Sequence, residues 1–230
     1  NQEPTHVCMA LNRLGSAAAF GRLMLLVGIA GTLWYGQIAG LAASTSLLLM
    51  PRVFGHAHLA SLETAMNLAY VAAILSVARW CGKANDGPLP PITFRKATWA
   101  GLFWGLALLT KIQAVLIGPP VVAWTRWHWR KKALVPLLVW GGIGLMVFFL
   151  GWPWLWFDPL DHARQFFHRS TNRATLYVYY FGERFADIAV PWHYPFVFFL
   201  TTIPVGLLAL GLLGSVSSSS GQVPLTKDRK

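Results

Sequence analysis

Apolar residues gather in long blocks along the chain instead of alternating with polar residues. A helix rises 1.5 Å per residue and satisfies its own backbone hydrogen bonds, so about 20 apolar residues cross the hydrocarbon core of a bilayer. A soluble helical protein would need polar faces, which these blocks lack. The pattern therefore predicts an all-α, multi-pass integral membrane protein with helices over Leu23–Tyr35, Ile38–Met50, Leu59–Ala78, Ala97–Thr125, Ala133–Trp152 and Tyr194–Gly214.

The block Ala97–Thr125 differs from the others because Lys111 lies near its centre and Gly118-Pro119-Pro120 follows shortly after. In a single straight span the lysine would lie near the bilayer midplane, at a cost of roughly 2.5–3.5 kcal/mol. Two short helices that turn near Lys111 avoid this cost. We therefore expect seven membrane segments, two of them short.

Composition agrees with a membrane protein, since the 230 residues are 55% hydrophobic and only 12% charged. The net charge is +11, but the basic residues lie at the ends of the apolar blocks, where they set topology. No basic stripe interleaved with aromatic residues is present, so we expect no nucleic-acid partner. With the end of Leu59–Ala78 placed in the cytoplasm, the cytoplasmic side holds Arg79, Lys83, Arg95, Lys96, Arg126, Arg130, Lys131, Lys132, Lys227, Arg229 and Lys230.

The opposite side then holds fewer basic residues, as the positive-inside rule predicts, and most of the acidic residues. It also holds the polar, aromatic-rich segment 152–193, which we expect to be a large extracytoplasmic loop. Within this loop, DHARQFFHRSTNR is typical of an amphipathic helix on the membrane surface. Its arginines, Arg173 among them, either bind a phosphate group or attract anionic lipid. Cys8 and Cys81 fall on opposite sides, so no disulfide is expected between them.

Ionisable side chains enter an apolar block in the segment PRVFGHAHLASLETAMN, residues 51–67. Such groups are costly inside a membrane and are therefore functional candidates, unless they reach water at the interface. Apolar residues follow Glu63 directly, so for this residue we favour a functional role over a position at the interface. His56 and His58 would point in different directions on a helix and would not bind one metal ion together, whereas in an extended segment they could.

Lys111 follows the apolar residues GLALLT. A lysine in apolar surroundings needs an anion, either a carboxylate or a phosphate. The alternative is a lysine at a helix end that reaches water. The residues leave both interpretations open.

Several short motifs occur in a recognisable order: PRVFGHAHLASLET, GLALLTK, WPWLWFDPL, YYFGERF, PWHYP and TTIP. In this order they resemble the family of dolichyl-phosphate-mannose–protein mannosyltransferases and lipid A aminoarabinose transferases, which are GT-C membrane glycosyltransferases. The resemblance extends over nearly the whole chain.

The resemblance implies a GT-C type domain over residues 1–214, with the outer loop 152–193, followed by a polar tail, 215–230, that we expect to be disordered. It implies inverting transfer of a sugar from a polyprenyl-phosphate carrier to a protein or lipid acceptor, on the extracytoplasmic face of the bacterial inner membrane. Glu63 would be a catalytic residue, the second acidic residue of the active cavity. The residues that would bind the carrier or line the cavity are Arg52, His56, His58, Lys111, Arg173, Tyr180 and His193. No cofactor follows from these residues, and a divalent metal is left open.

In the family, the principal catalytic carboxylate lies in an outer loop after the first span, and we expect both to precede Asn1. The chain would then be one part of an enzyme. The alternative function is a secondary transporter with an intramembrane site at His56, Glu63 and Lys111, which predicts broken helices. A non-catalytic scaffold would leave Glu63 and Lys111 without a purpose.

Overall fold

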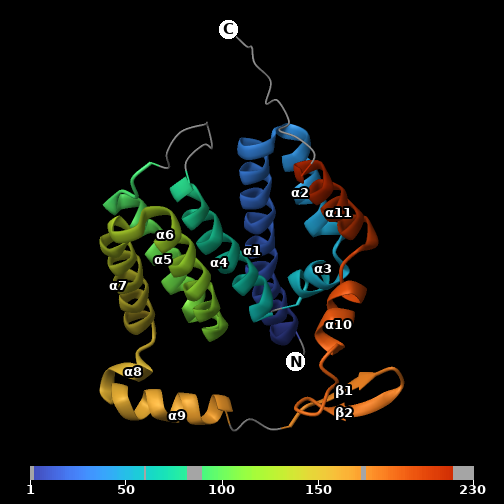
Figure 1. Ribbon diagram of the computed structural model, residues 1–230. Coiled ribbons are helices and arrows are strands. Elements are labelled where there is room, and N and C mark those ends of the chain that lie inside the picture. Colours follow the sequence, from blue (N-terminus) through green and yellow to red (C-terminus); the bar gives the residue numbers. More distant parts are fainter. Residues whose placement is uncertain (1–2, 60, 82–89, 172–174, 220–230) are drawn as a thin grey trace. The chain divides into compact units, whose positions relative to one another are not determined.

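Helices account for most of the chain, as the apolar blocks predict (Figure 1). The computed structural model describes residues 3–59, 61–81, 90–171 and 175–219. They belong to two compact units, Asn1–Thr171 and Asn172–Lys230. The first unit contains α1 (Glu3–Tyr35), α2 (Gln37–Leu49), α3 (Pro51–Ala57), α4 (Leu62–Ala78), η1 (Arg79–Cys81), α5 (Phe94–Thr110), η2 (Ile112–Ile117), α6 (Gly118–Trp129), η3 (Arg130–Ala133), α7 (Leu134–Gly151), α8 (Trp154–Phe157) and α9 (Pro159–Thr171).

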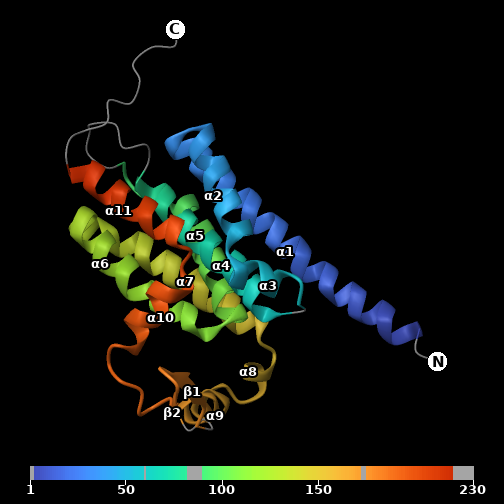
Figure 2. The ribbon, with the colours of Figure 1, turned by 90° about the vertical axis from the view of Figure 1, so that its right-hand side faces the viewer.

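The helices α1 and α2 form an antiparallel pair (Figures 1 and 2). The chain turns between them at Gly36, whose φ of 94° is rarely adopted by other residues. A Cβ atom at Gly40 would meet the backbone oxygen of Gly28 at 2.5 Å, so the two helices approach closely at this point. Such close contacts between small residues are typical of helices packed in membranes.

The main apolar core lies among α4, α5, α6 and α7, and Trp104 on α5 is part of it. The ring of Trp104 stacks on that of Trp140 on α7, with centroids 4.2 Å apart. Its Nε1–H donates a buried hydrogen bond of 2.9 Å to the backbone oxygen of Ala114. Because a Cβ atom at Gly105 would meet the backbone oxygen of Gly144 at 2.6 Å, glycine allows α5 and α7 to pack closely.

The chain reverses direction on each side of α6. The bond from Trp104 to Ala114 holds the residues after Lys111 against α5. At the other end of α6, Trp129 Nε1–H donates to the backbone oxygen of Pro90, shortly before α5 begins (3.1 Å). The helix α6 therefore runs antiparallel to α5 (Figure 1), and the predicted turn near Lys111 is confirmed.

Two helical stretches of the described chain are long and apolar enough to cross a membrane. They are Arg13–Tyr35 and Ile112–Gly151, and the second contains both α6 and α7. Counting each of two bent helix pairs as one span gives up to four. Large apolar side chains on these helices face outward, including Ile38 and Leu41, which are 87% and 71% exposed. A soluble monomer rarely exposes apolar patches of this extent, so a lipid environment accounts for them. The number of seven membrane segments stays a prediction.

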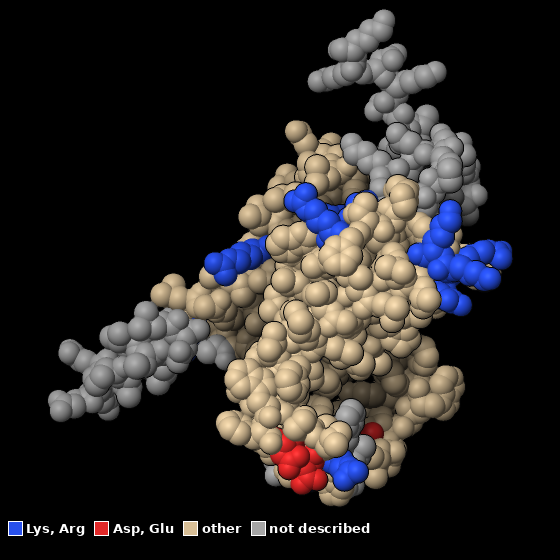
Figure 3. Space-filling model, turned by 90° about the vertical axis from the view of Figure 1, so that its left-hand side faces the viewer, with Lys and Arg blue, Asp and Glu red and all other residues tan. Residues whose placement is uncertain are grey.

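Charge is distributed unevenly between the two ends of the helix bundle in the first unit. On the face drawn in Figure 3, most Lys and Arg side chains lie toward one end, and the acidic side chains lie at the other. The hydrogen bond from Trp80 Nε1–H to the backbone oxygen of Lys96 (3.4 Å) joins the end of α4 to the start of α5. The basic residues of these two segments therefore lie at the same end of the bundle. The same end holds the α6–α7 connection, with Arg126, Arg130, Lys131 and Lys132.

The second unit contains a β-hairpin that the sequence analysis did not predict, followed by two helices. Its elements are β1 (Tyr177–Tyr180), β2 (Glu183–Ala186), α10 (Tyr194–Thr202) and α11 (Val205–Ser219). The strands pair antiparallel around Phe181 and Gly182, which have φ of 50° and 87°. Such a pair of positive φ angles is typical of two-residue hairpin turns.

The predicted single helix over Tyr194–Gly214 is wrong, because α10 and α11 meet at an angle of 100°. The break lies at Ile203-Pro204, where Ile203 has an extended backbone (ψ 131°). Proline has no backbone N–H and disfavours helical geometry in the preceding residue, which explains the break. The helix α11 continues through Ser219, beyond the start of the predicted tail 215–230, of which residues 220–230 lie outside the described residues.

Substituting leucine for Gly105 tests the close packing of α5 and α7. Gly105→Leu should lower the free energy of unfolding by about 1–3 kcal/mol, because the side chain has no room beside Gly144. Thermal unfolding in detergent, followed by circular dichroism, measures the change. Gly142→Leu on α7 is the matched control, since nothing lies within 4 Å of a Cβ atom there. Equal melting temperatures for the two variants would contradict this packing.

Candidate functional site

An ion pair between Glu63 and Lys111 joins two motifs that lie 48 residues apart in the sequence. The ammonium Nζ of Lys111 donates to Oε1 of Glu63 at 2.7 Å. The two side chains are 38% and 32% exposed, so both are partly shielded by protein and partly open to their surroundings. Of the two anions that the sequence allows for Lys111, the structure provides the carboxylate.

Glu63 is positioned by the start of α4. The hydroxyl of Ser61, the N-cap residue, accepts a hydrogen bond from the backbone N–H of Glu63 at 3.2 Å. This satisfies one of the free N–H groups of the first turn and fixes where the helix begins. A carboxylate in the first turn is also stabilised by the helix dipole.

Lys111 is positioned by the end of α5. Its backbone is extended (φ −159°, ψ 126°), while its N–H still donates to the backbone oxygen of Ala107 at 3.0 Å. The residues that follow turn back against α5, held by the bond from Trp104 to Ala114. Because Lys111 is the last residue before this turn, its side chain extends from the end of the helix toward the start of α4.

Two further predicted residues contribute to this group. Arg52 and His56, both on α3, lie close enough to Glu63 for a positive charge on either side chain to act on its carboxylate. His56 Nδ1 lies 3.4 Å from the hydroxyl of Ser61, the same hydroxyl that accepts from Glu63. The imidazole is thus linked to the start of α4 through one side chain. The sequence analysis missed Ser61, although a serine directly before an apolar run is a helix-start signal.

The structure does not bring His58 into this group. Its Nδ1 is 2.9 Å from the backbone oxygen of Phe54, and its ring packs on the Phe54 ring, with centroids 4.3 Å apart. His56 therefore contacts Ser61 while His58 contacts Phe54, in different directions, as the spacing of the two histidines predicts for a helix. Within the described residues, no group of three or more His, Cys, Asp or Glu side chains is arranged to hold a metal ion.

A cavity of about 420 Å³ lies beside Lys111. It is lined by the last residues of α5, including Leu109 and Thr110, and by Phe148, Trp152 and Phe166. The helix α9, which carries Phe166, confirms the helix predicted in the outer loop. The cavity has the volume of a small-ligand pocket, with aromatic walls and one cation at its edge.

Tyr180 and His193 lie near each other in the second unit, with ring centroids 5.6 Å apart. Tyr180 ends β1 and is 9% exposed, and its ring also contacts Phe181, Phe185 and Tyr194. His193 directly precedes α10. Arg173, the remaining predicted residue, lies outside the described residues.

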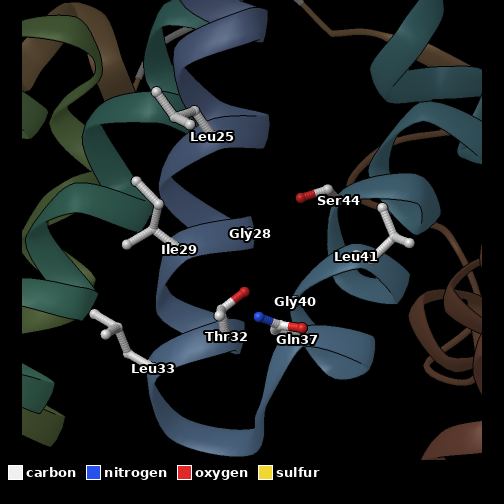
Figure 4. A pocket seen from close by; sticks show the side chains of 9 residues that line it. All are labelled: Leu25, Gly28, Ile29, Thr32, Leu33, Gln37, Gly40, Leu41 and Ser44. Atoms are coloured by element: carbon white, nitrogen blue, oxygen red, sulfur yellow. The ribbon is translucent and has the colours of Figure 1, made fainter.

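Another hollow, of about 370 Å³, lies between α1 and α2 (Figure 4). Leucine, isoleucine and glycine form most of its lining, and Thr32 and Ser44 point across the space between the helices. The hydroxyl of Ser44 donates to the backbone oxygen of Met24 at 3.0 Å. No charged side chain lines this hollow.

Comparison with models of known protein families, with curated proteins and with solved structures gives no match.

A double-mutant cycle measures the coupling between Glu63 and Lys111. Glu63→Gln and Lys111→Met should each destabilise the protein, and the double variant should lose less than the sum. We expect a coupling energy of about 1 kcal/mol, because the pair combines a charge-assisted hydrogen bond with partial exposure. Unfolding in detergent provides the four stabilities. Additivity within about 0.5 kcal/mol would contradict the ion pair.

Proposed function

We propose that this chain is part of a membrane glycosyltransferase that moves a sugar from a polyprenyl-phosphate carrier to a protein or lipid acceptor on the extracytoplasmic face. The observation that carries the proposal is the Glu63–Lys111 pair, whose Lys111 lines the aromatic-walled cavity. Such a transfer requires a base for the acceptor hydroxyl and a cation for the departing phosphate, and the two must separate when the substrates bind between them. The resemblance of the motif order to GT-C glycosyltransferases supports the same function.

Glu63 and Lys111 have different roles in the proposed transfer reaction. The Glu63 carboxylate accepts the proton of the acceptor hydroxyl, whose oxygen forms a bond to the anomeric carbon of the sugar. The bond from that carbon to the carrier phosphate oxygen breaks, and the electron pair leaves with the phosphate. Lys111 stabilises this departing anion, and it does so most strongly in surroundings poor in water. Arg52 and His56 add positive charge around the same group.

The position of the pair supports an extracytoplasmic site. Glu63 lies in the first turn of α4 and Lys111 directly follows α5. Both therefore lie at the end of the bundle opposite Arg79 and the basic α6–α7 connection. The positive-inside rule assigns the basic end to the cytoplasm. The loop helix α9, which contributes Phe166 to the cavity, then lies outside.

A secondary transporter is the second candidate, and the bent helices favour it. The helices α2 and α3 meet at 73°, close to His56, and broken helices surround the sites of many transporters. However, Glu63 and Lys111 lie at helix ends, where a transporter site would lie near the middle of the membrane. The position of the pair therefore favours the transferase.

Labelling of single cysteines tests the orientation. With Cys8 and Cys81 replaced by alanine, Gln165→Cys on α9 should react with a membrane-impermeant maleimide in intact cells. Lys132→Cys should react only after the membrane is opened. Both positions are exposed, so accessibility to solvent is matched. The reverse pattern of labelling would contradict the proposed site.

Sugar transfer to a membrane extract from labelled polyprenyl-phosphate sugars tests the function. Glu63→Gln should lower the rate about 10²- to 10⁴-fold, because it removes the base. Lys111→Met should lower it by about 10²-fold or more, because it removes the cation that stabilises the phosphate.

The charge-swapped double variant, Glu63→Lys with Lys111→Glu, is the control for a purely structural pair. It restores an ion pair between the same positions but exchanges the base and the cation, so we expect stability to recover while transfer stays lost. Transfer at the wild-type rate in this variant would show that the pair only stabilises the fold. Unchanged transfer in both single variants would remove these residues from the mechanism.

A further inference from the structure

A groove of about 460 Å³ runs along α4 in the first unit, away from the Glu63–Lys111 pair. Figure 1 shows α4 between α5 and α1, and residues of all three helices line the groove. Ala65, Ala69 and Ala72 lie on one face of α4, at helical spacing, and their short side chains leave a hollow. Leu25 of α1 and Phe103 of α5 belong to the sides.

The few polar groups of the groove define what it can hold. Its polar lining consists of Arg22, Ser76 and Arg79, and the Ser76 hydroxyl already donates to the backbone oxygen of Ala73 at 2.6 Å. Within the part of the chain that the structure describes, neither arginine forms an ion pair. An occupant must therefore be apolar along most of its length and anionic at the end where Arg79 lies.

Arg79 lies at the basic end of the bundle in a fixed position. The next residue, Trp80, is fully buried and donates to the backbone oxygen of Lys96, which ties this end of α4 to α5. Exposed basic residues surround this end, and the connecting segments 79–81, 90–96 and 126–133 contain no acidic residue. Such a cluster attracts the anionic lipids of the cytoplasmic leaflet.

We propose that this groove binds one acyl chain of an anionic phospholipid, with the lipid phosphate on Arg79. The groove follows α4 from Ala65 to Arg79, which is about 21 Å at 1.5 Å per residue, so it is long enough for the hydrocarbon depth of one leaflet, about 15 Å. The positive charge of Arg79 and of the basic residues around it favours an anionic lipid headgroup over an uncharged partner helix.

Lipid retention by the purified protein tests the phosphate contact. The protein, in a mild detergent, is mixed with phosphatidylglycerol or phosphatidylcholine, and bound lipid is counted by native mass spectrometry. Wild type should retain phosphatidylglycerol in preference to phosphatidylcholine. Arg79→Gln should weaken retention about tenfold, as the loss of one charge-assisted hydrogen bond predicts, whereas Arg79→Lys should keep most of it. Arg126→Gln, an exposed arginine at the same end but outside the groove, is the control and should bind like wild type.

Filling the groove tests the acyl-chain contact. Ala72→Leu should reduce retention of phosphatidylglycerol, while Ala123→Leu, at an exposed alanine on α6, should not. Equal retention of the two lipids by wild type would overturn the proposal, as would wild-type retention by Arg79→Gln or Ala72→Leu. A lipid-free wild type that forms a dimer, lost in Ala72→Leu, would assign the groove to a second copy of the chain and overturn it as well. Sugar transfer does not enter these measurements, so they are independent of the proposed enzyme activity.

Discussion

The hydrogen-bonded ion pair between Glu63 and Lys111 joins the first turn of α4 to the residue that directly follows α5. A lone ammonium group among apolar helices would be costly, and so would a lone carboxylate. Pairing reduces both costs, but only if α5 ends at Lys111 and the chain then turns back. The antiparallel α6 and the bond from Trp104 to Ala114 provide this turn, and the cavity beside Lys111 exists because of it.

The two ends of the bundle have different chemical characters, and both proposals depend on this polarity. One end carries Arg79 and the basic α6–α7 connection, which suit the anionic headgroups of cytoplasmic lipids. The other end carries the ion pair, with the aromatic side chains of Trp152 and Phe166 around the cavity. A transferase that takes its donor from a lipid carrier needs such an arrangement, because its orientation in the membrane decides which leaflet supplies the donor.

The sequence predicts most helices of the first unit, because the length and polarity of each block are local properties. However, α1 begins at Glu3, twenty residues before the predicted block Leu23–Tyr35, because its first part is too polar to stand out as an apolar block. It also predicts the turn at Lys111 from the cost of a buried charge. It does not predict that Glu63 is the partner of Lys111, because the two residues are 48 positions apart and either a carboxylate or a phosphate would satisfy the ammonium group. Pro204 indicates the break before α11, but the block Tyr194–Gly214 is apolar throughout, so the sequence analysis treated it as one helix. The hairpin after Tyr180 requires a positive φ at Phe181, which a phenylalanine does not signal.

The central claim is that Lys111 exchanges the Glu63 carboxylate for the phosphate of a lipid carrier. The most direct measurement is solid-state NMR on ¹⁵N-lysine-labelled protein in bilayers, with and without polyprenyl phosphate. The account predicts dephasing of one lysine Nζ signal by ³¹P when the carrier is added, and loss of that signal in Lys111→Arg. A Lys111 signal that shows no ³¹P dephasing at saturating carrier would contradict the account.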